Sequence, residues 1–124
     1  MFEPRKQQVS QYVVRDMDII RKYLALEFGF DILDGGRKRP YVDARKVFVQ
    51  ILHEKYGLQG NLNRQKLLTL QNVADYMNYP NHSSIIWLLR NWDVLISWDP
   101  AYKEIYNRVF KKVGDDYMIH KNNL

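Results

Sequence analysis

The 124-residue chain has 46% hydrophobic and 27% charged residues, a balance typical of one folded globular domain with a single core. Its 19 Lys and Arg against 14 Asp and Glu give a formal charge of +5, which is compatible with binding a polyanion without requiring it, and its lack of cysteine excludes disulfides, cysteine-ligated zinc and thiol nucleophiles. No apolar run approaches the roughly 18–20 residues of a membrane span, and the first residues lack the apolar stretch of a signal peptide, so we expect a soluble cytoplasmic protein with no membrane association.

Two amphipathic helices are predicted in the first half of the chain, separated by a basic loop over residues 31–40. The first covers residues 9–28 and ends at Gly29. Its apolar stripe consists of Val13, Met17, Ile20 and Leu24. The second helix ends at Gly57 and places Lys46 and Gln50 on its solvated face. Its apolar stripe consists of Ala44, Phe48, Ile51 and Leu52.

Three further helices are predicted after a polar connection that ends at Lys66. Thr69 is the expected N-cap of the third helix, Asn81 is that of the fourth, and Asp99 followed by Pro100 starts a fifth that Gly114 ends. The apolar stripes are Leu70, Val73, Ala74 and Met77 in the third helix, Ile85, Leu88, Leu89 and Trp92 in the fourth, and Tyr102, Ile105, Tyr106 and Val109 in the fifth. The sequence therefore predicts an all-α, single-domain bundle of about five helices, with a loose tail over residues 114–124.

Two polar clusters are candidates for function. The first is a basic run with Asp43 as its single acid, and it comprises Arg37, Lys38, Arg39, Arg45 and Lys46. The second, at the start of the fourth helix, comprises Asn81, His82, Ser83 and Ser84. At that position the helix dipole and free N–H groups also favour phosphate. A short helix, a turn and a second capped helix form the arrangement of a helix-turn-helix, whose second helix enters the major groove of DNA.

These clusters resemble the C-terminal DNA-binding domain of the bacterial replication initiator DnaA. The run Asn81-His82-Ser83-Ser84-Ile85 is similar to the Asp-His-Thr-Thr-Val core of that family's signature. Residues 37–46 are similar to its basic loop, and residues 20–30 to the helix before that loop. The resemblance covers residues 18–113, with residues 1–17 as an extension of the first helix. It departs from the signature at Asn81, at Asn78-Tyr79-Pro80 in place of glycines, and at Trp87 in place of a smaller residue.

The resemblance implies a non-enzymatic module that binds double-stranded DNA. It assigns Arg39 to the minor groove and Arg90 to a phosphate, and gives major-groove or backbone contacts to Arg45, Asn81, His82, Ser83 and Ser84. Arg37, Lys38, Lys46 and Trp87 complete the predicted DNA-binding set. Because no Gly-Lys-Ser/Thr phosphate loop is present, we expect no ATP-driven assembly and no cofactor. We expect an accessory replication or regulatory protein of a phage or mobile element, associated with the nucleoid of a bacterial or phage-infected cell.

Alternative interpretations remain open at this stage. The basic run alone is compatible with a merely solvated loop, and Trp87 with a residue covered by the C-terminal tail. The chain could be a protein-interaction or virion-associated module on the same fold, with Ile86 and Trp87 as its contact patch, or could bind structured RNA. The three histidines have no metal-ligand spacing, and Asp16 and Asp18 point apart on one helix, so neither a metal site nor an enzyme is expected. Trp98, like Trp92, is expected in the core.

Overall fold

The structure is a computed structural model that describes residues 9–58 and 67–122, with side chains up to position 114. Its helices are α1 (Gln11–Phe28), α2 (Arg39–Tyr56), α3 (Leu70–Tyr76), α4 (Ser83–Arg90), α5 (Trp92–Trp98) and α6 (Ala101–Asn122). No strand occurs in these described ranges, which confirms the all-α prediction. None of the helices described is both long and apolar enough to cross a membrane.

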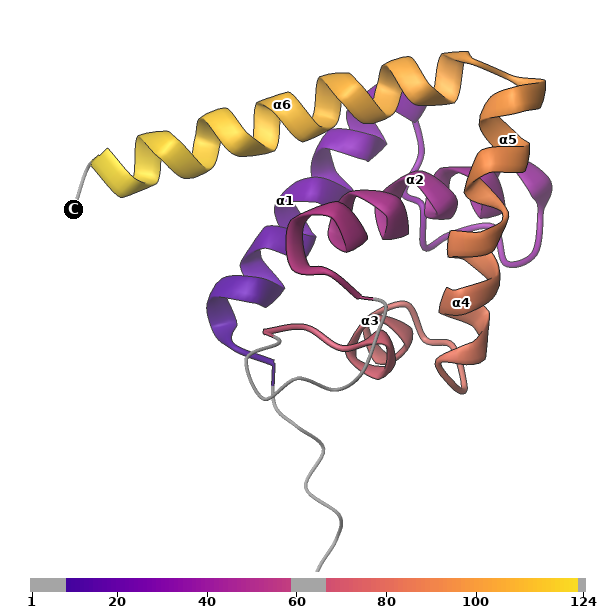
Figure 1. Cartoon of the computed structure of the whole chain (residues 1–124), viewed down its shortest axis with the longest axis horizontal. Helices are drawn as coiled ribbons and strands as arrows, with labels where there is room; N and C mark the ends of the chain where they lie inside the picture. The colour runs from indigo at the N-terminus through magenta and orange to yellow at the C-terminus, as the bar shows by residue number, and fades with distance from the viewer. Residues whose placement is uncertain (1–8, 59–66, 123–124) are drawn as a thin grey trace, which may run out of the picture.

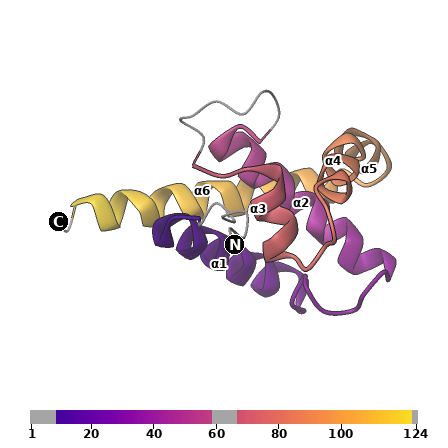
Figure 2. The same ribbon diagram turned by 90° about the horizontal axis from the view of Figure 1, so that it is seen from below.

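The central element is α2, which contacts α1, α4, α5 and α6. In Figure 1, α6 lies across the top of the molecule, while α4 and α5 follow one another along one edge. Seen from below in Figure 2, that edge lies at the end of the molecule opposite the C-terminus. The short helix α3 contacts α4 and therefore joins the same edge to the rest of the core.

The predicted apolar stripes form most of the core, because helical spacing brings their members onto one face. Each stripe residue of α1 and α2 is at most 3% exposed. In the other helices the stripe residues Leu70, Tyr102 and Ile105 pack against the core while remaining partly exposed. Trp92 is buried as predicted, but Trp98 is 82% exposed, so its assignment to the core is wrong.

The helix boundaries differ from the predictions in three places. The fourth predicted helix is two helices that meet at Asn91, whose backbone N–H and side-chain amide both donate to the Trp87 carbonyl, at 3.1 and 2.8 Å. Helix α2 starts at Arg39, since Pro40 is pre-organised for a first helical turn. Helix α6 continues past Gly114, so that predicted stop is wrong; a helix-interior glycine costs only about 1 kcal/mol.

The end of α3 depends on a left-handed residue. Asn78 has a φ of 61°, and it is the only non-glycine residue with positive φ in the described ranges. Its N–H donates to the Asp75 carbonyl at 3.2 Å, while the next N–H, of Tyr79, donates to the Ala74 carbonyl at 2.8 Å. This pair of bonds is the Schellman motif, which requires glycine or asparagine at the left-handed position. Asn78 therefore directs the chain from α3 towards α4.

Replacing Asn78 with a β-branched residue is expected to destabilise the protein. Asn78→Val should lower the free energy of unfolding by about 1–2 kcal/mol, because a left-handed conformation strains its backbone, whereas Asn78→Gly should leave it unchanged within about 1 kcal/mol. Thermal denaturation followed by circular dichroism measures both. Asn107→Val is the matched control, because Asn107 is exposed on α6 and because asparagine and valine have similar helix propensities. Equal loss in both valine variants would contradict the assignment.

Candidate nucleic-acid interface

The basic loop and the start of α4 line one open groove of about 1080 Å³. Arg37 and Arg39 lie on one wall, and Ser83, Ser84 and Trp87 lie on the other. The turn between α3 and α4 and the first turns of α2 complete the lining. Members of both polar clusters singled out in the sequence, about forty residues apart along the chain, therefore meet at one surface.

The loop cations are held at the entrance of the groove and remain accessible. Arg37 and Lys38 are exposed, and the side chain of Arg39 is 90% exposed. The Nε of Arg39 is 3.9 Å from Asp43 Oδ2, one turn along α2, which is a long, weak ion pair between an exposed guanidinium and a largely buried carboxylate. Lys38 occupies the N-cap position of α2 and does not line the groove. Arg37 and Arg39 are thus the loop cations free to reach a ligand in the groove.

Arg45 has a different position from the one predicted for it. Its side chain points into the protein, where the residue is only 6% exposed. Its guanidinium donates to three backbone carbonyls of the basic loop and to the hydroxyl of Tyr79. With these donors engaged inside the fold, Arg45 is not placed to contact DNA directly, and that prediction is corrected.

Acidic and aromatic side chains hold the remaining part of the loop. Asp31 accepts two hydrogen bonds from Arg21, at 2.8 and 2.5 Å, and a third from the Leu33 N–H at 3.1 Å. The guanidinium of Arg21 keeps the pKa of Asp31 below its usual value, so this link stays intact at neutral pH. At Gly35 a Cβ atom would lie 2.3 Å from the ring of Tyr41, and φ is 76°, so only glycine fits there.

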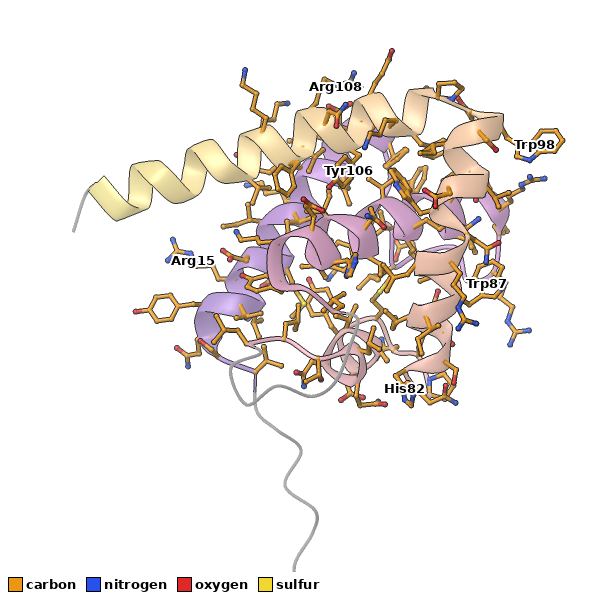
Figure 3. The ribbon with its side chains drawn as sticks, in the orientation of Figure 1. Arg15, His82, Trp87, Trp98, Tyr106 and Arg108 are labelled. Atoms are coloured by element: carbon orange, nitrogen blue, oxygen red, sulfur yellow. The ribbon has the colours of Figure 1, made fainter. Side chains whose placement is uncertain are left out.

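Lys46 and Trp87 form the side of the groove between α2 and α4. Lys46 is not on a solvated face as predicted: its side chain is 12% exposed and its Nζ is 3.0 Å from Asp43 Oδ1. The same ammonium lies 5.2 Å from the centre of the Trp87 ring, a cation–π distance. Trp87 is nevertheless 52% exposed and points outward in Figure 3. Lys46 thus supports one face of the indole and leaves the rest accessible.

The polar residues at the start of α4 form its N-terminal cap region. The side chain of Asn81 accepts a hydrogen bond from the Ser83 N–H at 2.9 Å, although His82, one residue later than predicted, is the N-cap. Asn81, His82 and Ser83 are exposed and Ser84 is partly exposed, and His82 lies at the tip of the helix in Figure 3. Of this cluster only Ser83 and Ser84 line the groove, whereas Asn81 and His82 lie beyond it. Arg90 is exposed on α4 outside the groove.

Several groove residues were not among the predicted DNA-binding residues. They are Leu33, Gly36, Val42, Asp43, Met77, Asn78, Tyr79, Pro80 and Leu88. Asp43 was noted only as the single acid within the basic run, and it pairs with Lys46. Tyr79 was noted only within Asn78-Tyr79-Pro80, as a departure from the family signature, and a tyrosine before a proline is otherwise ordinary turn sequence.

The two acids of α1 that the sequence analysis considered, Asp16 and Asp18, have structural partners on other helices. Asp16 accepts hydrogen bonds from Tyr56 and Lys55, and Asp18 accepts one from Tyr76, so these carboxylates join α1 to α2 and α3 instead of facing solvent alone. Among the residues that the structure describes, no three His, Asp or Glu side chains are grouped so that they could hold a metal ion. The groove itself contains one carboxylate, that of Asp43.

Comparison of the chain with protein-family models, with curated proteins and with solved structures gives no significant match.

Proposed function

We propose that this protein is a non-enzymatic module that binds double-stranded DNA through the groove between the basic loop and α4. The observation that carries the proposal is that Arg37, Arg39, Ser83 and Ser84 line the same groove. Long cations beside short hydroxyl side chains suit the edge of a duplex, where phosphates give salt-dependent affinity and base edges give sequence preference. In this proposal α3, the turn and α4 act as a helix-turn-helix, with the start of α4 in the major groove.

The resemblance to the C-terminal domain of DnaA supports the same proposal. Where the family signature has glycines before its aspartate, this chain has Asn78, whose left-handed φ of 61° is one that glycine adopts most readily. Asn81 replaces the aspartate and its side-chain oxygen still accepts from the Ser83 N–H. At these two departures the chain therefore still has a left-handed residue and a side-chain acceptor ahead of α4. Trp87 widens the apolar part of that helix, and we expect it to shift the preferred sequence.

Selection of bound duplexes from a random library at moderate salt tests the proposal. We expect an enriched motif, and an affinity whose logarithm falls linearly with the logarithm of salt concentration. Arg39→Ala should reduce the magnitude of this slope by about one and weaken binding to all duplexes or relax a preference for A·T pairs. A folded Arg39→Ala protein that binds every duplex as tightly as wild type would remove the loop from the interface. Duplex RNA as competitor separates DNA from RNA binding.

The second candidate, a protein-interaction or virion-associated module, is favoured by one observation. Trp87 and Trp98 are 52% and 82% exposed, and both point outward along the edge formed by α4 and α5 (Figure 3). Exposed aromatics of this size are common at protein interfaces. The same titrations with Trp87→Ala separate the candidates. Loss of a self-association or protein complex, with no duplex binding by wild type even at low salt, would favour this second function.

A further inference from the structure

Arg45 connects the loop to the protein core through its whole guanidinium group. Its Nε donates to the Ile32 carbonyl at 2.6 Å, one Nη to the Gly36 carbonyl at 2.6 Å, and the other Nη to the Asp34 carbonyl at 2.9 Å. Three carbonyls of one loop thus converge on one planar group. A rigid fork of donors orders such a loop more effectively than a flexible ammonium, because less conformational freedom is lost for each hydrogen bond.

The same guanidinium also reaches the opposite wall of the groove. The Nη that binds Gly36 donates to the Tyr79 hydroxyl at 3.2 Å, and the guanidinium carbon is 5.9 Å from the centre of the tyrosine ring. Tyr79 is itself fixed by its backbone bond to the Ala74 carbonyl at the end of α3. One side chain from α2 therefore links the basic loop to the turn that precedes α4.

The charge of Arg45 is not neutralised by a carboxylate. Within the described part of the chain, its hydrogen-bond acceptors are carbonyl and hydroxyl oxygens, and it takes part in no salt bridge there. Arg21 and Arg108, by contrast, each pair with an acid. A buried cation in a low-dielectric surrounding is costly by itself, and an anion in the adjoining groove offsets that cost. Arg45 lines the groove, so its field acts on whatever binds there.

We infer that Arg45 is a positioning residue, which holds the cationic loop and the start of α4 at the spacing that a DNA duplex requires, and that the Tyr79 hydroxyl couples the two walls. This inference rests on the proposed function. It separates Arg45 from Arg37 and Arg39, which are placed to touch the ligand. It also gives Tyr79 a role in duplex binding, although the Tyr79 hydroxyl contacts Arg45 and not the duplex.

Tyr79→Phe tests the coupling, because it removes one hydroxyl and keeps the ring. We expect duplex affinity to fall roughly three- to tenfold, the range expected for the loss of one ordinary hydrogen bond. In the free protein, amide hydrogen exchange of residues 34–38 should become faster. Tyr56→Phe is the matched control: its hydroxyl joins α2 to Asp16 on α1, away from the groove and the loop, so neither affinity nor loop exchange should change.

Arg45→Lys completes a double-mutant cycle. It keeps the charge but cannot span three carbonyls and a hydroxyl, so we expect faster loop exchange and weaker binding. In that background Tyr79→Phe should add no further loss of affinity, since the hydroxyl acts through the guanidinium. An equal loss in both backgrounds would show that the tyrosine touches the duplex itself, which overturns the coupling.

Three other outcomes also decide the matter. If Tyr79→Phe speeds loop exchange but leaves affinity unchanged, the link is structural only and the positioning role fails. If Arg45→Lys does not fold, the comparison of Tyr79→Phe with Tyr56→Phe still decides between the roles. Absence of duplex binding by wild type at low salt would refute the proposed function. The exchange measurement would still show separately whether Arg45 and Tyr79 hold the loop in place.

Discussion

Reversing the charge of Arg37 and Arg39 in the double variant Arg37→Glu, Arg39→Glu is expected to weaken duplex binding by roughly a hundredfold or more near 100 mM salt. Each arginine that no longer binds the duplex costs about 1–2 kcal/mol of binding free energy. Both side chains are exposed at the groove entrance, so neither substitution removes core packing. The free energy of unfolding should therefore stay within about 1 kcal/mol of wild type. Fluorescence titration of a labelled duplex and chemical denaturation measure the two quantities.

A matched control separates the place of the charges from their sum. Lys22→Glu with Lys111→Glu lowers the formal charge from +5 by the same four units, but Lys22 and Lys111 are exposed on α1 and α6, outside the groove. Net charge alone acts at long range and is screened beyond about 8–10 Å at these salt concentrations. The control should lose only a few-fold in affinity. A comparable loss in both double variants would mean that binding is diffuse and that the groove is not the interface.

The all-α fold and its core were predictable because burial follows the helical period. Val13, Met17, Ile20 and Leu24 could be assigned to one face from spacing alone, since a helix buries whichever face is continuous and apolar. The split at Asn91 could not be foreseen in the same way. It falls on a single residue, Asn91, whose side-chain bond to the Trp87 carbonyl one turn earlier leaves no mark on the apolar period of the sequence.

The candidate site was only partly predictable, because residue type does not determine which way a long side chain points. Arg39 and Arg45 both belong to the basic run, yet Arg39 is exposed and Arg45 is buried beneath the basic loop. The difference arises from tertiary position: Arg45 lies where three loop carbonyls need a donor, and the sequence holds no sign of those carbonyls. Trp98 shows the converse, an aromatic on an apparent stripe that none of the described elements covers.

The two faces of α4 should respond in opposite ways to substitution, and this is the second large effect that we expect. Ile85 is fully buried against the core, so Ile85→Ala should lower the free energy of unfolding by about 2–5 kcal/mol through reduced burial and the cavity left behind. This is a large share of the roughly 5–15 kcal/mol typical of a domain. Below its unfolding transition, that variant should still select the wild-type DNA motif.

Ser83→Ala should give the reverse result. Ser83 is exposed, and the bond that Asn81 accepts comes from its backbone N–H, so the helix cap survives and stability should change by less than about 0.5 kcal/mol. Ser83 lines the groove, however, and removal of its hydroxyl should cost roughly three- to tenfold in affinity for the preferred duplex and less for others. Duplex selection and urea denaturation on both variants measure this contrast. A residue that touches the bases must alter sequence preference without unfolding the helix that carries it. The start of α4 therefore does not contact the bases if Ser83→Ala selects the wild-type motif with wild-type affinity while Ile85→Ala, still folded, selects a different motif.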